Sequence, residues 1–528
     1  MDFIFQADAQ LVSISPIIMP KHRSLKTKVV NVPREGPELV IGLVGAVGTD
    51  LHLVYSQIRQ ELTNVGYESG LIHLINLLPS FNKKRIKTQT EENRINDLMT
   101  QGNKYRKKTK RGDALALLAV GAIREIRQNI TGQPNIPIKN RAYVLRSLKH
   151  PQEEETLRAI YGKAFILVAA YSPRHLRLES LARRVAISYN SSDYDKYRDK
   201  AEQLIQRDAS EDTLPLGQNL RETFPRADIF FNTSEPKAFE ASLKRFIEML
   251  FKHPFHTPLP DEYSMFIAEA ASLRSADLGR QVGTAIATDD GGIVAVGTNE
   301  VPKSGGGLYW SDDTPDYRDF RWQYASSDTI RKTLLSDILS RLMQNRWFTK
   351  KRTHQKLDVL VKEAMAEMHG AQFMNLIEFQ RAVHAEMAAL LDAARRGVSV
   401  KGCTLYSTTF PCHDCAKHIV AAGIRKVVYI YPYPKSRAGE LYPDSISLDG
   451  LIEKPESFSE RSPGPVQFEP FVGVAPRRYI DLFTMNHRKQ DGRPIKWRGD
   501  QATPKGVDDI PLLYLSKEAV FLKEVGHA

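Results

Sequence analysis

The chain has 528 residues, of which 42% are hydrophobic and 26% charged, and its 74 Lys and Arg exceed its 62 Asp and Glu by 12. This length exceeds one ordinary hydrophobic core, so we expect two or more domains, and the composition indicates a globular protein and excludes a disordered one. The basic excess favours polyanionic partners such as nucleotides, phosphates or RNA, although a generally basic surface explains it equally well.

The sequence carries no pattern typical of secretion or membrane insertion. It has no uninterrupted run of about 18 apolar residues, and MDFIFQADAQLVSISP at its start lacks the basic-then-apolar order of a signal peptide. We therefore expect a cytoplasmic protein that does not contact a membrane. Its three cysteines, Cys403, Cys412 and Cys415, form an odd and clustered set, which argues against disulfides and favours a metal site.

The first half of the chain alternates strand and helix patterns. Residues 1–35 predict an extended basic arm, and ELVIGLVGAVGTDLHLVYSQIRQEL (38–62) then predicts a strand, a glycine-rich turn and an amphipathic helix. The apolar runs LIHLINLL, AYVLRSL, AFILVAAY and ADIFFN follow, separated by charged helical stretches. This alternation predicts βαβ units and a mainly parallel sheet, which we place at residues 36–251.

The pattern restarts after a Pro- and His-rich junction, HPFHTPLPDEY, where we place a linker at 252–262. The second half, 263–528, begins with a helix and the strand pair VGTAIATDDGGIVAVGTN, whose DDGG centre predicts a hairpin. A charged, largely helical segment at about 316–378 has the character of an insertion, because it separates this hairpin from the helix that carries His384 and Glu386. Beyond Cys415 the sequence predicts a helix, AKHIVAAG, and a strand, KVVYIYPY.

One nitrogen and two thiolates, from His384, Cys412 and Cys415, make up the candidate metal site. Three protein ligands leave the fourth position of a tetrahedral zinc ion open, as a catalytic zinc needs, whereas structural zinc sites use four. The chain has no fourth cysteine. The alternative is a structural site, in which the nearby His413 or His418 supplies the fourth ligand.

Glu386 lies two residues after His384, close enough to share a zinc-bound water without ligating the metal. Pro411 predicts a helix start at Cys412, and the positive end of that helix favours ionised thiolates. H-x-E followed by P-C-x-x-C is the signature of zinc nucleobase deaminases. In that chemistry zinc lowers the pKa of water from about 15.7 toward 7, hydroxide attacks carbon 4 of cytosine, and the glutamate shuttles protons. We therefore predict Zn²⁺ as the cofactor and Glu386 as the catalytic residue.

Two stretches resemble known deaminases. GCTLYSTTFPCHDCAKHIVAAGIRKVVYIYPYPKS (402–436) resembles the cytidine deaminase superfamily, and SADLGRQVGTAIATDDGGIVAVGTNEVP (275–302) resembles the first helix and two strands of deoxycytidylate deaminases. The second resemblance rests on R-Q-V-G at the entry and G-x-N-x-x-P at the exit of the strand pair. It implies that Asn299 contacts the sugar of the substrate, the alternative being a turn asparagine, and that Arg280 and Ala385 also bind substrate.

The glycine-rich turn IGLVGAVGTDLH (41–52) follows the first predicted strand and opens a helix, where backbone N–H groups bind phosphate. It resembles the loop of small P-loop kinases, which implies nucleotide contacts at Gly45, Gly48 and Thr49. Aligned from Gly45, however, the lysine position of that motif falls on Leu51 and its Ser/Thr position on His52. These departures argue against phosphoryl transfer, and leave the sensing of ATP or another nucleotide, or a structural vestige, as the alternatives.

The combination of a degenerate P-loop kinase-like half and a deoxycytidylate deaminase-like half resembles the bacterial anti-phage cytosine-nucleotide deaminases. The resemblance implies an α/β fold, with an N-terminal P-loop NTPase-like parallel-sheet domain and a C-terminal cytidine deaminase-like α/β/α domain. It further implies a homo-oligomer that converts dCMP and dCTP to dUMP and dUTP, and so depletes the cytosine deoxynucleotide pool during phage infection. Some members of that family are held inactive by a small RNA.

Two other functions stay open at this point. One is a deaminase that edits polynucleotides, with the basic arm and the N-terminal half as nucleic-acid binders; the other is a nucleotide-sensing regulatory protein with a structural zinc. Editing enzymes need an aromatic-lined groove for flanking nucleotides, and the sequence shows no such channel, which favours free nucleotides. No motif marks the residues that meet the phosphates, so the sequence does not decide between dCMP and dCTP.

Overall fold

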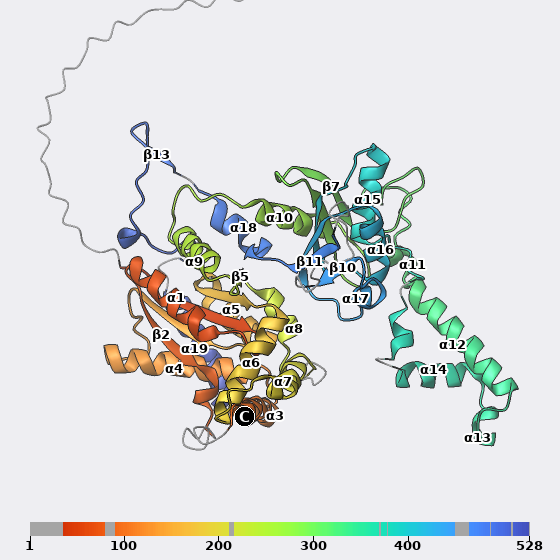
Figure 1. Cartoon of the computed structure of the whole chain (residues 1–528), viewed down its shortest axis with the longest axis horizontal. Coiled ribbons are helices and arrows are strands. Elements are labelled where there is room, and N and C mark those ends of the chain that lie inside the picture. The colour runs from red at the N-terminus through yellow and green to blue at the C-terminus, as the bar shows by residue number, and fades with distance from the viewer. Residues whose placement is uncertain are drawn as a thin grey trace, which may run out of the picture.

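A computed structural model of the protein describes residues 35–79, 90–210, 216–368, 371–376, 378–448, 464–485, 487–507 and 511–526. Two six-stranded sheets, each with helices on both faces, lie side by side (Figure 1). The predicted basic arm, apart from Glu35, lies outside the described residues. Among the described helices, none combines the length and the apolar character needed to span a bilayer.

The first sheet has the strand order β12-β5-β4-β1-β3-β2. Its first five strands in the chain are parallel to one another, as predicted, and are β1 (Leu39–Gly45), β2 (Glu68–His73), β3 (Arg141–Arg146), β4 (Phe165–Tyr171) and β5 (Ile229–Asn232). The predicted strand LIHLINLL is wrong in its second part, where residues Leu74–Leu77 form the 3-10 helix η1. Strand β2 ends at His73, opposite Arg146, the last residue of its partner β3.

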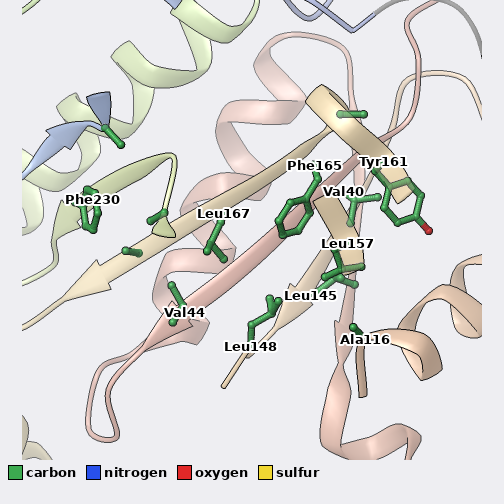
Figure 2. Close-up of a cluster of buried hydrophobic side chains, with 14 of the residues drawn as sticks. Val40, Val44, Ala116, Leu145, Leu148, Leu157, Tyr161, Phe165, Leu167 and Phe230 are labelled. Atoms are coloured by element: carbon green, nitrogen blue, oxygen red, sulfur yellow. The ribbon is translucent and has the colours of Figure 1, made fainter. Parts of the chain in front are cut away.

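The central strand β1 is buried on both faces. Leu39 and Ile41 belong to the hydrophobic cluster on one face, and Val40 and Val44 to the cluster on the other, which Figure 2 shows. A continuous apolar run is typical of a parallel strand that is covered on both sides. The sequence LVIGLVG therefore explains why this strand lies at the centre of the sheet.

Helices cover both faces of the first sheet. Helices α1 (Leu51–Asn64) and α9 (Pro236–Leu250) cover one face, and α4 (Ala114–Thr131) and α5 (Pro151–Tyr161) cover the other. A separate group packs beside the glycine-rich turn and consists of α3 (Glu91–Thr109), α6 (Arg174–Ser188) and α7 (Arg198–Ser210). The short elements of this half are η2 (Gly162–Ala164), η3 (Asp195–Tyr197), α8 (Leu220–Thr223) and η5 (Phe224–Arg226).

The second sheet has the strand order β10-β11-β9-β8-β6-β7. Its strands are β6 (Gly283–Ala287), β7 (Ile293–Thr298), β8 (Thr404–Thr409), β9 (Lys426–Tyr431), β10 (Ile446–Leu448) and β11 (Val466–Pro470). Strands β6 and β7 form the predicted hairpin, and β8 to β11 pair in parallel. Helix α10 (Pro260–Ser272) covers one face, and α15 (Ala385–Arg396) and α16 (His413–Ala421) cover the other. The short helix α17 (Ala438–Leu441) follows β9.

The segment between the hairpin and α15 is helical over most of its described residues. It contains α11 (Asp319–Trp322), α12 (Ser326–Gln344), α13 (Lys350–Thr353), α14 (Leu357–Glu367) and η6 (Gln372–Asn375). Helices α12 and α14 pack against each other and project away from the second sheet (Figure 1).

The end of the chain returns to the first sheet. Strand β12 (Gly473–Val474) pairs antiparallel with β5, and α18 (Pro476–Phe483), β13 (Lys489–Gln490), β14 (Arg493–Pro494) and η7 (Gly499–Gln501) follow. Helix α19 (Pro511–Gly526) packs on α4 and α5, where Glu518 accepts a hydrogen bond from the fully buried Arg127 at 2.7 Å. The sequence predicts one continuous second half from 263 to 528; in the structure the last part of that range completes the first half.

Candidate active site

The N-terminus of α15 carries two of the predicted site residues. His384 is the N-cap residue and Glu386 lies in the first turn. Strand β7 comes very close to this turn: a Cβ at Gly297 would lie 2.1 Å from the carbonyl oxygen of Ala385. Glycine at this position therefore lets the helix start directly against the sheet, which places His384 and Glu386 at its edge.

The N-terminus of α16 carries both cysteines of the site. Cys412 is the N-cap residue, and its sulfur accepts a hydrogen bond from the backbone N–H of Cys415 at 3.4 Å. A sulfur at the positive end of a helix is stabilised as a thiolate, as a metal ligand must be. The third cysteine, Cys403, is buried in the core of the second sheet and is not part of this group.

The three predicted ligands meet at one point. His384 Nδ1 lies 3.3 Å from the sulfur of Cys412 and 3.3 Å from that of Cys415. A tetrahedral zinc ion, with bonds of about 2.0–2.3 Å, holds a nitrogen and a sulfur about 3.6 Å apart, so the side chains fit zinc with little adjustment. Among the described residues, neither His413 nor His418 joins the group, and His418 Nδ1 instead contacts a carbonyl oxygen of its own helix at 2.8 Å.

The second ring nitrogen of His384 has a partner that no motif in the sequence marks. His384 Nε2 lies 2.6 Å from the side-chain oxygen of Gln380. An amide oxygen only accepts hydrogen bonds, so Nε2 carries the proton and Nδ1 presents its lone pair to the metal. Gln380 thus fixes both the tautomer and the orientation of the ring.

Glu386 is almost completely buried, with 4% of its surface exposed. Burial raises the pKa of its carboxyl to about 7, and the negative charge of Cys412 adds to the effect. The hydrogen bond with Cys415, followed by that with His384, lowers the pKa of Cys412 to about 4. A carboxyl with a pKa near neutrality can both accept and return a proton, which is the property that a proton shuttle needs.

A cavity of about 360 Å³ opens over this group. The predicted substrate residues Asn299, Arg280 and Ala385 all line it, together with His384 and Glu386. The structure therefore brings the two predicted sets, from the hairpin and from the metal motif, to one place.

Backbone contacts explain why the hairpin meets the metal group. Glu300 and Val383 form an isolated antiparallel bridge, so the residues next to them, Asn299 and His384, face the same cavity. The Asn299 side-chain oxygen accepts from the N–H of Val282 at 2.7 Å, and its amide nitrogen donates to a carbonyl oxygen of the same entry loop at 2.8 Å. Asn299 thus ties the exit of the hairpin to its entry while facing the cavity.

The cavity also contains residues that sequence reasoning did not single out. Lys435 and Tyr433, after β9, and Phe410, before the cysteine motif, line it. Lys435 is exposed, as Arg280 is, so two cations border the same cavity. The spacing of the metal motif does not indicate Lys435, because this residue lies after α16 and β9 in the sequence and reaches the cavity only through the fold.

The stretch that holds this site also has relatives among known proteins. Residues 259–431 match the cytidine and deoxycytidylate deaminase zinc-binding region. This stretch, called the deaminase region below, contains the three candidate metal ligands, Glu386 and Asn299. Together with the group of one imidazole and two thiols, the match supports Zn²⁺ as the metal.

Individual deoxycytidylate deaminases match parts of this chain. The deoxycytidylate deaminase of Enterobacteria phage T2 is 51% identical over 57 residues, which are 11% of this chain and 30% of the phage enzyme. The Homo sapiens deoxycytidylate deaminase is 26% identical over 169 residues, 32% of this chain and 63% of the human enzyme. The crystal structure of dCMP deaminase from the cyanophage S-TIM5 in complex with dCMP and dUMP is 19% identical, with a TM-score of 0.22, and covers 41% of this chain and 100% of that chain. The chain thus spans less than a third of the phage T2 enzyme and less than two thirds of the human one.

The glycine-rich turn lies outside the deaminase region and borders a cavity of its own. Gly45, Gly48 and Thr49 line this cavity of about 430 Å³. The N–H of Val47 donates to the carboxylate of Asp208 at 2.7 Å. The carboxylate of Asp50, the N-cap residue of α1, accepts from the N–H groups of His52 and Leu53, each at 3.0 Å. Carboxylates of the chain itself thus occupy N–H groups that bind phosphate in the P-loop kinases that the turn resembles.

A lysine reaches this turn from another strand. The ammonium of Lys149, which follows β3, lies 3.0 Å from the carbonyl oxygen of Gly45 and 3.1 Å from the carboxylate of Asp208. Lys149 therefore places beside the turn the positive charge that the turn's own sequence lacks. About a hundred residues separate Lys149 from the turn, so a motif search along the chain does not find it.

Proposed function

We propose that this chain is a zinc-dependent deaminase of free deoxycytidine nucleotides. The observation that carries the proposal is the meeting of His384, Cys412 and Cys415 with the buried Glu386 beside one cavity of the deaminase region. A cytosine ring in that cavity meets the metal group and the carboxyl at the same time.

Each side chain has a separate task in this proposal. When bound, zinc activates a water molecule as the nucleophile for carbon 4 of cytosine. Glu386 takes the proton of the water, passes it to the ring nitrogen, and helps the amino group leave as ammonia. Gln380 holds the ring of His384 in place. The products are the deoxyuridine nucleotide and ammonia.

The remaining cavity residues suit the sugar and the phosphate of a nucleotide. Arg280 and Lys435 are exposed cations at the cavity, and charged hydrogen bonds of this kind are the usual way to bind phosphate. Asn299 uses one lone pair and one N–H in bonds to the entry loop. Its amide has a second lone pair and a second N–H, which we assign to the sugar.

The size of the cavity favours a free nucleotide over a polynucleotide. Its volume of about 360 Å³ lies in the range of roughly 300–1,000 Å³ that is typical of small-molecule sites. The test is to incubate the purified protein with dCMP, with dCTP and with a cytosine-containing single-stranded oligonucleotide. We expect dUMP or dUTP from the free nucleotides, and uracil that forms only in the oligonucleotide contradicts the proposal. Arg280→Ala and Lys435→Ala are expected to raise KM more than they lower kcat.

We propose a second role, nucleotide sensing, for the cavity beside the glycine-rich turn. Arg94, Arg146, Arg184 and Lys149 line this cavity, and they supply the positive charge that phosphates need. The central position of β1, with the turn at its carboxyl end, is the arrangement expected of a P-loop NTPase-like domain. Equilibrium dialysis with ATP, before and after Arg146→Ala, measures this binding, and deamination rates with and without ATP or dTTP measure its effect.

A cellular role follows from the sequence resemblance. We propose that the protein acts in the bacterial cytoplasm as a homo-oligomer, depletes dCTP during phage infection, and is held inactive by a small RNA. Plaque counts and dCTP pools in infected cells that express the wild type or Glu386→Gln test the defence role. Native mass spectrometry of the purified protein tests the oligomer and a bound RNA. Equal dCTP pools in the two strains contradict the defence role.

A further inference from the structure

The Pro- and His-rich junction between the two halves contains a second group of metal-binding side chains. Glu248 lies in the last turn of α9, and His253 and His256 follow in the loop before α10. One donor atom from each of the three lies within 4.8 Å of the others. This group contains no cysteine and none of the residues assigned above to the deamination site.

The backbone brings this group together without help from a ligand. Lys252 adopts a left-handed conformation with φ of +62°, which reverses the chain after α9. The N–H of His253 then donates to the carbonyl oxygen of Glu248 at 2.9 Å. This turn fixes the first histidine over the last turn of the helix, and His256 follows three residues later on the same side.

The side chains of the group are in direct contact. His256 Nε2 lies 2.6 Å from the Glu248 carboxylate, and the rings of His253 and His256 are 4.2 Å apart. The indole of Trp497 packs against His253 at 5.1 Å and donates from its nitrogen to the carbonyl oxygen of Phe251 at 3.0 Å. The C-terminal segment thus supports one side of the group.

We propose that Glu248, His253 and His256 bind a divalent transition-metal ion, with zinc as the first choice, and that this ion secures the loop between α9 and α10. Two imidazoles and one carboxylate are a common protein ligand set for zinc, and nitrogen and oxygen donors also suit nickel, cobalt and ferrous iron. The group is half-buried, so water can complete the coordination shell. The ion replaces the proton shared by His256 and Glu248.

The change of geometry that binding requires is small. An imidazole nitrogen and a carboxylate oxygen on one tetrahedral ion lie about 3.4 Å apart. The present separation of 2.6 Å must therefore grow by about 0.8 Å, which rotation of the Glu248 side chain can supply. The alternative is a metal-free hydrogen-bonded pair with a stacked imidazole, and it makes a different prediction for metal content.

The test counts metal ions in the full chain. The metal-free protein is loaded with Zn²⁺, passed through a desalting column, and analysed by inductively coupled plasma mass spectrometry. We expect two ions per chain in the wild type and one in each of His256→Ala and Glu248→Gln. His175→Ala, which removes an exposed histidine of α6, serves as the matched control and should keep two.

Cobalt distinguishes the two sites without any activity measurement. The thiolate-to-cobalt absorption comes only from the site with Cys412 and Cys415, so it should saturate after one equivalent while a second Co²⁺ still binds. His256→Ala should lose the second equivalent and keep the thiolate band. One ion per chain in the wild type, or a second ion that survives both His256→Ala and Glu248→Gln, overturns the proposal. The result does not depend on whether the protein deaminates nucleotides.

Discussion

Gln380→Ala tests whether the side chain behind His384 contributes to metal binding. The substitution removes the acceptor that lies 2.6 Å from His384 Nε2 and leaves all three ligands in place. Loss of such a partner typically costs roughly 10- to 100-fold in metal affinity, which corresponds to about 1.4–2.7 kcal/mol. Because two thiolates still hold the ion, we expect an affinity in this weakened range and not the loss of zinc.

The assay is competition for Zn²⁺ between the protein and a chromophoric chelator at neutral pH. Gln380→Glu keeps an acceptor oxygen at the same place and should restore most of the affinity. Glu378→Ala changes an exposed side chain two residues earlier and should match the wild type. An unchanged affinity in Gln380→Ala, or an equal loss in Gln380→Glu, refutes the role assigned to this hydrogen bond.

Three further substitutions test other parts of the account. Gly297→Ala places a Cβ 2.1 Å from the Ala385 carbonyl oxygen. We therefore expect the free energy of unfolding to fall by about 1–3 kcal/mol and zinc to bind more weakly. A denaturation midpoint equal to that of the wild type contradicts the expected loss of stability. Arg127→Ala removes the guanidinium that the buried Glu518 and Glu38 share, and leaves Glu518 with Arg124 at 3.5 Å. The loss should cost about 3–5 kcal/mol, measured by urea unfolding, and normal stability would show that α19 docks by other contacts. Asp208→Asn removes the charge of a carboxylate that contacts the glycine-rich turn, and with it about 1–4 kcal/mol of repulsion toward a phosphate. ATP should therefore bind at least several-fold more tightly, as measured by calorimetry. Weaker binding contradicts the sensing role.

The metal group was predictable because its geometry is local. His384 and Cys412 are both N-cap residues, and each begins a helix that the sequence already indicates. Glu386 and Cys415 lie two and three residues further on, so the first turn of each helix sets their positions. The prediction of a mainly parallel first sheet is confirmed for a similar reason, because strands that alternate with helices favour parallel pairing.

The parts that were missed depend on contacts between distant segments. Lys435 reaches the cavity only because β9 returns beside β8, and Lys149 reaches the glycine-rich turn only because β3 lies beside β1. The return of the C-terminal segment includes the pairing of β12 with β5 and that of Glu518 with Arg127 across 391 residues of sequence. The periodicity and spacing of residues along the chain do not indicate which distant segments pair. The positions of Lys435, Lys149 and Glu518 are therefore seen only in the folded structure.

The most direct test of the central claim is the rate of dCMP deamination by zinc-loaded Glu386→Gln. The wild type should convert dCMP to dUMP with release of ammonia. The variant keeps the shape of the side chain and all three ligands, so it should retain the zinc content of the wild type while its rate falls by roughly 10²- to 10⁴-fold. A variant that deaminates at the wild-type rate, or a zinc-loaded wild type that releases no ammonia from any deoxycytidine nucleotide, contradicts the account.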